Sequence, residues 1–207
     1  TDDLGGTTTQ LITLTVSPVV DIVDDNLSVN EDAAITANVI TGTFGASADN
    51  FDGTPVLTSV TQGAHGSVSF LPDGSVTYTP VANYTGSDTF TYTVTSPAGV
   101  TETATVNVTV NPVNDPGSFG GNTSGSGTED GGAITGALTA SDIDGLTDGT
   151  LFTVSGPASH GTASINAATG AWSYTPVADY NGSDSFTVTL TDDLGGTTTQ
   201  LITLTVS

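Results

Sequence analysis

The sequence contains no lysine and no arginine, although its 207 residues include 22 Asp and Glu and give a formal net charge of −22. Nucleic acid is excluded as a partner, because binding to phosphates needs a basic surface. An anionic membrane surface is disfavoured for the same reason. Apart from pairs with the two histidines, no ion pair between side chains can form. Solvent, backbone N–H groups, salt or bound cations must therefore relieve the repulsion between the acids.

Cysteine and methionine are also absent. A chain without cysteine has no disulfide framework, no zinc–thiolate site, no thiol redox chemistry and no cysteine nucleophile. The apolar runs are far shorter than the ~18 residues that a membrane-spanning helix needs. Threonine, glycine and serine are abundant instead. This composition is typical of an extracellular bacterial repeat.

The first seventeen residues, TDDLGGTTTQLITLTVS, recur letter for letter as residues 191–207. An exact repeat at a spacing of 190 residues (191 − 1) is the signature of a tandem array. We therefore interpret residues 1–17 as the closing strand of a preceding repeat. A structural or adhesive repeat is the leading hypothesis before any site is considered.

A weaker repeat lies inside this period. The run from Tyr78 to Phe90 (YTPVANYTGSDTF) matches the run from Tyr174 to Phe186 (YTPVADYNGSDSF). The period thus holds two related units of roughly 95 residues, the size of a small β-sandwich. We place domain 1 at residues 18–112 and domain 2 at residues 113–207.

The apolar pattern has a period of two, which predicts strands that bury one face. In residues 104–110 (ATVNVTV) every second residue is apolar, and Thr or Asn lies between. Turn sequences such as Pro72-Asp73-Gly74 separate the runs. The chain is therefore predicted to be all-β, two tandem Ig-like (cadherin-like) antiparallel sandwiches. The segment 117–127 (GSFGGNTSGSG) has few apolar residues, and we expect it to be an irregular entry into domain 2.

Acidic residues gather where Ig-like domains place their loops. The prominent groups are Glu31-Asp32, Asn114-Asp115, Asp142-Ile143-Asp144-Gly145 and Asp192-Asp193. Two carboxylates in an Asp-x-Asp turn point toward one place, and oxygen ligands without His or Cys favour Ca²⁺. Burying such carboxylates together without a cation would be very costly. The alternative is that they are solvated loop acids or Asx turns.

The pattern from Glu31 through the YTPxAxYxGxDxF core to Asn111-Pro112-Val113-Asn114-Asp115 resembles the bacterial cadherin-like and VCBS-type repeats of giant RTX-type adhesins. The resemblance covers almost the whole chain. It implies extracellular extender domains that serve cell adhesion and biofilm formation, with Ca²⁺ at the domain junctions. By analogy with cadherins, the resemblance implies a metal site whose ligands are Glu31, Asn114, Asp115, Asp142, Asp144 and Asp192.

Domain 1 departs from this pattern at its own entry. Ser96 stands where domain 2 has Asp192, and the looser pair Asp49 and Asp52 replaces the tight Asp-x-Asp. We therefore expect the cation site at the junction of domains 1 and 2 rather than at the start of domain 1.

Other positions that recur in both units have structural interpretations. Asp88 and Asp184 are expected to fix a loop by accepting backbone N–H bonds, and Tyr84 and Tyr180 to bond backbone as a tyrosine corner does. We interpret His65 and His160 as turn residues and Trp172 as a core residue.

No pairing of nucleophile and base, phosphate-binding loop or transition-metal cluster stands out, and we predict that the chain is not an enzyme. The favoured function is a non-catalytic extracellular spacer of a large bacterial surface adhesin, with Ca²⁺-stiffened junctions. Its partners would be neighbouring repeats of the same chain or neighbouring copies, end to end. One alternative is a filament subunit in which residues 1–17 complement another chain by strand addition. Another is a carbohydrate-binding module.

Overall fold

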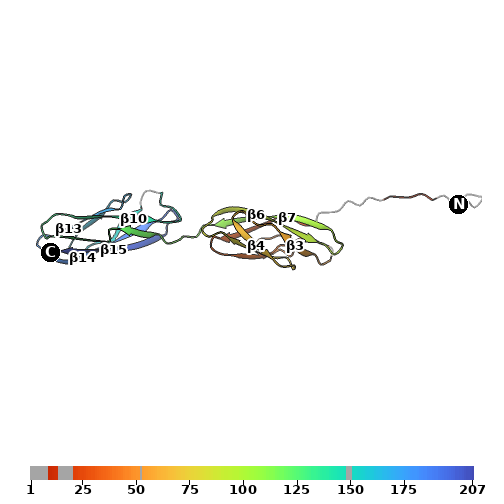
Figure 1. Ribbon diagram of the computed structural model, residues 1–207, viewed down its shortest axis with the longest axis horizontal. Coiled ribbons are helices and arrows are strands. Elements are labelled where there is room, and N and C mark those ends of the chain that lie inside the picture. The colour runs from red at the N-terminus through yellow and green to blue at the C-terminus, as the bar shows by residue number, and fades with distance from the viewer. Residues whose placement is uncertain (1–8, 14–20, 52, 148–150) are drawn as a thin grey trace, which may run out of the picture. The chain divides into compact units, whose positions relative to one another are not determined.

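The computed structural model of the chain describes residues 9–13, 21–51, 53–147 and 151–207. The closing strand expected at residues 1–17 lies outside these residues except for 9–13, and so does Asp52. The chain divides into two compact units, Thr1–Pro112 and Val113–Ser207. No helix occurs in the described residues, and strands run along the length of each unit (Figure 1).

Unit 1 is a sandwich of two sheets. Its strands are β1 (Asp25–Asn30), β2 (Ile35–Asn38), β3 (Val56–Val60), β4 (Gly66–Phe70), β5 (Ser75–Pro80), β6 (Gly86–Thr95) and β7 (Thr101–Asn111). One sheet has the order β1-β7-β6-β3 and the other the order β2-β5-β4. The pairing is antiparallel except between β1 and β7, which run parallel. The all-β, Ig-like fold class predicted from the period-two pattern is confirmed.

Unit 2 repeats this plan with one extra strand. Its strands are β8 (Ser118–Gly121), β9 (Ser124–Gly127), β10 (Ile134–Ser141), β11 (Phe152–Gly156), β12 (Gly161–Ile165), β13 (Ala171–Pro176), β14 (Gly182–Thr191) and β15 (Thr197–Val206). The sheets have the orders β9-β15-β14-β11 and β12-β13-β10-β8. The strand β9 pairs parallel with β15, as β1 does with β7.

The irregular entry expected at residues 117–127 is wrong, because this segment forms both β8 and β9. Glycine is needed there for space rather than for mobility. A Cβ at Gly125 would lie 2.7 Å from Ile134 and 2.9 Å from Trp172, and one at Gly121 would lie 2.4 Å from the Ala137 carbonyl oxygen. The backbone of this glycine-rich segment thus packs directly against the large core side chains of Ile134 and Trp172.

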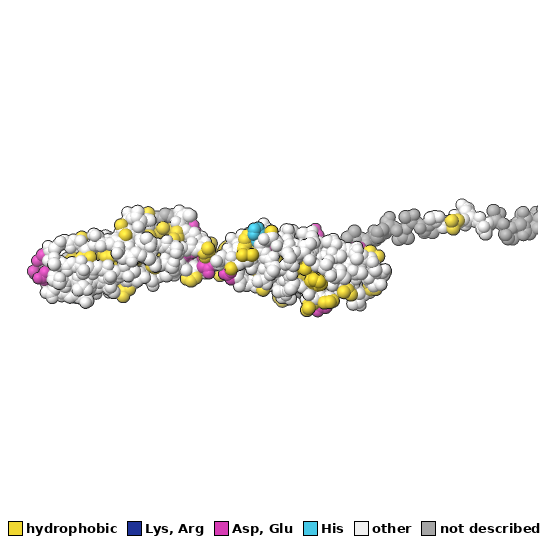
Figure 2. All heavy atoms as spheres, in the orientation of Figure 1, with side chains coloured by type: hydrophobic (Ala, Val, Ile, Leu, Met, Phe, Trp, Pro, Cys, Tyr) yellow, Lys and Arg dark blue, Asp and Glu magenta, His cyan; other side chains and the backbone are white. Residues whose placement is uncertain are grey.

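Each unit has its own hydrophobic core between its two sheets. In unit 1 the fully buried aromatic residues are Tyr78, Phe90 and Tyr92, and in unit 2 they are Tyr174 and Phe186. Trp172 is buried at 2% exposure and meets Phe186 edge-on, which confirms the predicted core role. The visible surface is mostly uncharged and shows no dark blue, as a chain without Lys and Arg requires (Figure 2).

Candidate metal centre

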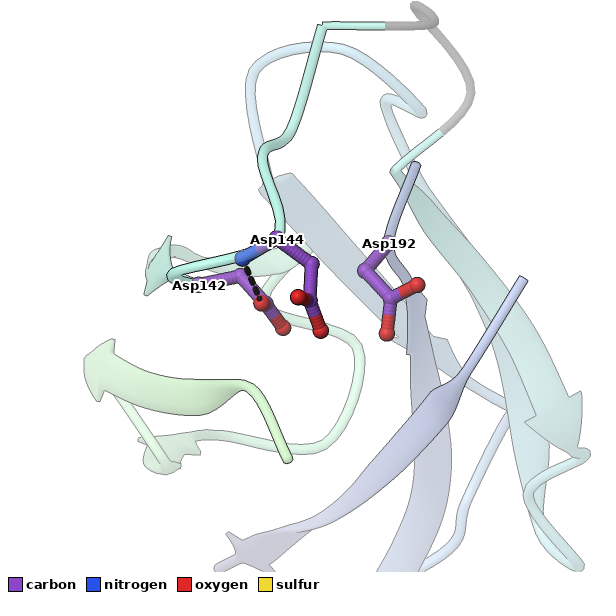
Figure 3. A group of neighbouring side chains, drawn as sticks. All are labelled: Asp142, Asp144 and Asp192. Carbon is purple, nitrogen blue, oxygen red and sulfur yellow. Dashed lines mark hydrogen bonds between the residues drawn. The ribbon is translucent and has the colours of Figure 1, made fainter. Parts of the chain in front are cut away.

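Three aspartates of unit 2 converge at one end of the sandwich (Figure 3). Asp142 and Asp144 follow the last residue of β10, and Asp192 follows the last residue of β14. These strands belong to different sheets. The site is therefore built where the ends of both layers meet. One oxygen of each carboxylate lies within 4.8 Å of the others.

Backbone N–H groups fix the orientation of these carboxylates. The Asp144 N–H donates to Asp142 Oδ1 over 2.9 Å, which is the bond drawn in Figure 3. The Asp115 N–H donates to Asp144 Oδ2 over 2.6 Å. Asp192 Oδ1 accepts N–H bonds from the turn that follows it, from Leu194 over 2.9 Å and from Gly196 over 2.8 Å.

One oxygen in the group stands out because it has no donor. Oδ2 of Asp142 is buried and has no hydrogen-bond partner. The Gly117 backbone lies against it, since a Cβ at that position would come within 2.6 Å of this oxygen. A buried carboxylate oxygen without a donor is costly. Asp192, at 3% exposure, adds a second buried acid.

The donor set fits a hard divalent cation. Its side chains offer only carboxylate oxygens, and the chain has no Lys or Arg to neutralise them. Oxygen ligands of this kind suit Ca²⁺, which tolerates irregular coordination. Asp142, Asp144 and Asp192 would hold the ion, and the ion would cancel their mutual repulsion.

A second set of contacts holds the loop that carries two of the aspartates. Asp193 accepts hydrogen bonds from the Thr147 N–H over 2.7 Å and from its hydroxyl over 2.6 Å. The Asp193 N–H donates to the Gly145 carbonyl over 3.1 Å. Sequence reasoning grouped Asp193 with Asp192 but assigned it no role. Both acids follow the end of β14 at Thr191, so strand alternation does not separate them, and only the contact with Thr147 assigns Asp193 its role.

The remaining predicted ligands have different positions. Asn114 packs against the Gly196 backbone, and its Nδ2 donates to the Asp115 carbonyl over 3.0 Å. Asp115 joins the group through its N–H. Glu31 belongs to unit 1, where it follows β1, is buried at 5% exposure and donates its N–H to the Asn111 carbonyl. The structure thus gathers three predicted ligands and places Asn114 and Asp115 beside them.

Unit 1 has no comparable group of three acids among residues 21–51 and 53–112. Ser96, at the position of Asp192, instead accepts a hydrogen bond from the Val100 N–H within its own turn. Asp49 Oδ1 accepts a bond from the Val23 N–H over 3.0 Å.

The other acids and aromatics of the repeat are structural, as predicted. Asp88 accepts backbone N–H bonds from Ala64, His65 and Thr89. The Tyr84 and Tyr180 hydroxyls each donate to a backbone carbonyl, that of Ser87 and that of Ser183, over 2.7 Å. The exposed rings of His65 and His160 stack on those tyrosines.

Comparisons with known families agree with the two-unit division. Residues 16–109 match the family model of the bacterial Ig domain, and residues 114–207 match that of the bacterial cadherin-like domain. No curated protein sequence matches the chain.

Among solved structures, human CDH23 EC21-23 aligns with a TM-score of 0.52 at 18% identity, covering 89% of this chain and 67% of that one. Protocadherin Gamma B2 extracellular cadherin domains 3-6 align with a TM-score of 0.51 at 11% identity, covering 90% of this chain and 46% of that one. The human Desmocollin-1 ectodomain aligns with a TM-score of 0.47 at 14% identity, and the chain covers 42% of it. At these identities the first two alignments show the fold alone, which is cadherin-like. The described residues include no helix long and apolar enough to cross a bilayer.

Proposed function

We propose that this chain, a bacterial Ig domain followed by a bacterial cadherin-like domain, is a spacer segment of a large bacterial surface adhesin whose domain junctions are stiffened by Ca²⁺. Domains of these families suggest an extracellular repeat or adhesin-like module and are typically non-catalytic. The observation that carries the calcium part is the convergence of Asp142, Asp144 and Asp192 with an unpartnered buried oxygen.

The proposed mechanism follows from charge. Without a cation, the three carboxylates repel one another at the entry to unit 2, and the loop that carries Asp142 and Asp144 is loosened. A bound Ca²⁺ removes the repulsion and fixes the loop. Glu31 of unit 1 and Asn114 are proposed as further ligands, which would tie the two units together and restrict their relative motion. Extracellular calcium modules typically bind with Kd near ~10⁻⁴–10⁻³ M.

Thermal unfolding of the full chain tests the cation. Trp172 is the only tryptophan and lies in the core of unit 2, so its fluorescence reports the unfolding of that unit. At 10 mM Ca²⁺ and fixed high ionic strength, a site of this affinity stabilises unit 2 by roughly 1.4–2.7 kcal/mol. We expect Mg²⁺ to give less, because it demands stricter geometry.

Asp144→Asn should abolish the calcium effect. Asp130→Asn is the matched control, because it removes the same charge at a distance from the site. The N–H of the neighbouring Glu129 donates to the Ser207 carbonyl, just after β15 ends, whereas Asp192 lies before β15 begins. Equal midpoints in Ca²⁺, Mg²⁺ and EDTA would refute the site. The stiffening is tested separately by small-angle scattering, where an unchanged maximum dimension in EDTA would contradict it.

We propose a second function, strand exchange between copies, on a different observation. Residues 7–16 have the sequence of β15, which lies between β14 and β9 and buries Ile202 completely. In the first copy of this sequence Leu11 is 89% exposed and Ile12 is 75% exposed. A second copy of a core strand sequence, with Leu11 and Ile12 exposed, is suited to strand addition in another chain's unit 2, if that unit releases its own β15.

The alternation of the strand supplies a sharp test. Ile12 corresponds to the buried Ile202, whereas Leu11 corresponds to Leu201, which is 49% exposed in β15. After refolding at high concentration, we expect end-to-end oligomers that Ile12→Asp abolishes and Leu11→Asp leaves intact. Equal effects of both variants, or a strictly monomeric chain, would contradict strand exchange.

The carbohydrate-binding alternative has no support from Trp172. Its ring is buried, and its Nε1 donates to the Asn122 carbonyl over 3.0 Å, so it offers no exposed face for stacking on a sugar.

A further inference from the structure

A carboxylate lies inside the core of unit 1. Asp25 begins β1 and shares its inward face with Leu27 and Val29, and its side chain is 0% exposed. Oδ1 accepts a hydrogen bond from the Ser47 N–H over 2.6 Å. Oδ2 is buried and has no hydrogen-bond partner. An unpaired oxygen of this kind demands a donor.

The groups around Asp25 include more hydrogen-bond acceptors than the Tyr92 hydroxyl can satisfy. The buried Tyr92 hydroxyl, on β6, lies 3.3 Å from the Val23 carbonyl, 3.3 Å from the Val39 carbonyl and 3.2 Å from Asp49 Oδ2. A hydroxyl has one proton, so it can satisfy one of these three acceptors. Burial, together with the nearby Asp25 and Asp49, raises the pKa of this hydroxyl. Asp25 thus adds a further acceptor to a group in which Tyr92 is the one hydroxyl donor.

No positively charged side chain compensates for the negative charge of Asp25. The ionisable groups around Asp25 are Asp24 beside it on the chain, Asp49 in the loop after β2, Tyr92 on β6 and, next to Asp49, Glu102 on β7. All of these are acids, and the chain has no Lys or Arg. Asp24 is occupied with the Thr105 N–H and Glu102 with the Asp21 N–H.

We propose that Asp25, Tyr92 and Asp49 form a proton-dependent lock, in which a proton on Asp25 holds the loop of residues 39–51 against the sandwich. The protonated carboxyl supplies the missing donor. When it ionises, a second negative charge faces Asp49 across the Tyr92 hydroxyl. The contacts that hold Val23, Val39 and Asp49 together then weaken.

The direction of the pH effect follows from burial. Desolvation raises the pKa of Asp25 from 3.8 to about 6, although the Ser47 N–H bond lowers it, and the nearby Asp49 and Asp24 raise it further. Burial also raises the pKa of Asp49. Because the folded pKa exceeds the unfolded one, the lock stabilises unit 1 at low pH and this contribution is lost as pH rises through about 6.

Unit 2 lacks the lock and supplies the matched substitution. By strand register, Thr123 occupies the place of Asp25 and Val188 that of Tyr92. The double variant Asp25→Thr, Tyr92→Val therefore installs the residues that unit 2 has at these register positions, where Val188 is buried and Thr123 is exposed.

The test is a carboxyl-carbon NMR titration of the full chain in EDTA. We expect Asp25 to titrate about two pH units above ordinary aspartates, and the Ser47 and Asp49 amides to lose protection against hydrogen exchange in step with it. The His65 amide, which is bonded to Asp88, is the internal reference. A titration midpoint of Asp25 near 4 would overturn the proposal. This outcome would also be expected if a buried water supplied the missing donor.

Stability provides the second readout. Between pH 5 and 7.5 the unfolding equilibrium constant of unit 1 should rise about tenfold. Asp25→Asn and the double variant should remove this slope. Asp24→Asn, one residue away, should keep it. Both histidines are present in every variant, so they do not distinguish the variants. A slope in Asp25→Asn as steep as in the parent would refute the lock.

Discussion

The Tyr174 hydroxyl donates to Asp184 Oδ2 over 2.8 Å, and Tyr78 makes the same bond to Asp88 in unit 1. Each tyrosine lies on the strand directly before the strand of its aspartate, and the two strands belong to opposite sheets of the sandwich. The bond therefore joins the two layers of each unit at a fixed point. The same aspartate also accepts backbone N–H bonds from the preceding loop, from Ser159 and His160 in unit 2.

Asp184→Ala should destabilise unit 2 by about 2–4 kcal/mol, because it leaves several donors without an acceptor. Tyr174→Phe removes one bond and should cost about 1 kcal/mol. Urea unfolding followed by Trp172 fluorescence measures both changes. Similar effects of the two variants would show that the backbone bonds of Asp184 contribute little.

Acid should weaken both units below pH 4. Burial raises the pKa of Asp184, but its hydrogen bonds outweigh burial and hold the pKa below its ordinary value. The pKa of Asp88 is held down in the same way. The folded pKa is lower than the unfolded one, so this stability is present above pH 4 and is lost as pH falls through the folded pKa. Acid titration of Trp172 fluorescence should show a smaller loss in Asp184→Asn, which has no proton to bind.

Gly161→Ala should destabilise unit 2 by about 1–3 kcal/mol. A Cβ there would lie 2.3 Å from the ring of Tyr174, which is fully buried and cannot move aside. Gly66 has the same relation to Tyr78 in unit 1. Gly195→Ala is the comparison, because nothing lies within 4 Å of its Cβ and only its φ of +85° opposes the change. Equal midpoints in urea for the Gly161 variant and the parent would contradict the close approach.

Asp193→Ala should lower calcium affinity about tenfold without removing a carboxylate of the site, because outer contacts orient metal ligands. It deletes both bonds to Thr147 and frees the loop of Asp142 and Asp144. Calorimetric titration of the full chain with Ca²⁺ is the measurement. Thr147→Val removes the hydroxyl bond but keeps the N–H bond, and its loss of affinity should be smaller.

Much of the fold could be predicted from residue alternation. The period-two runs around Phe90 and Phe186 became β6 and β14, since one buried face is enough to specify a strand. The strand β9 was missed because its inward positions are glycines that lie against Trp172 and Ile134, and a residue without a side chain carries no hydrophobic signal. The strand β8 was missed because Phe119 is its only large apolar residue.

Part of the candidate site could be anticipated in the same way. The Asp-x-Asp spacing and the acid after β14 identified Asp142, Asp144 and Asp192. The role of Asp193 could not be seen, because it depends on a contact with Thr147 across 46 residues. The buried Asp25 was equally hidden, since an acid at the start of a strand looks like a loop acid until the burial of its neighbours is known.

The parallel pairing of the first and last strands has a mechanical consequence. In unit 1 the strand β1 is bonded along six residues to β7, and in unit 2 the strand β9 is bonded along four to β15. Because these strands run in the same direction, the chain enters each sandwich at one end and leaves at the other. Tension along the chain would slide the two strands past each other and load all their evenly spaced hydrogen bonds at once. Such a sandwich resists pulling by shear rather than by peeling, and the longer contact makes unit 1 the stronger link.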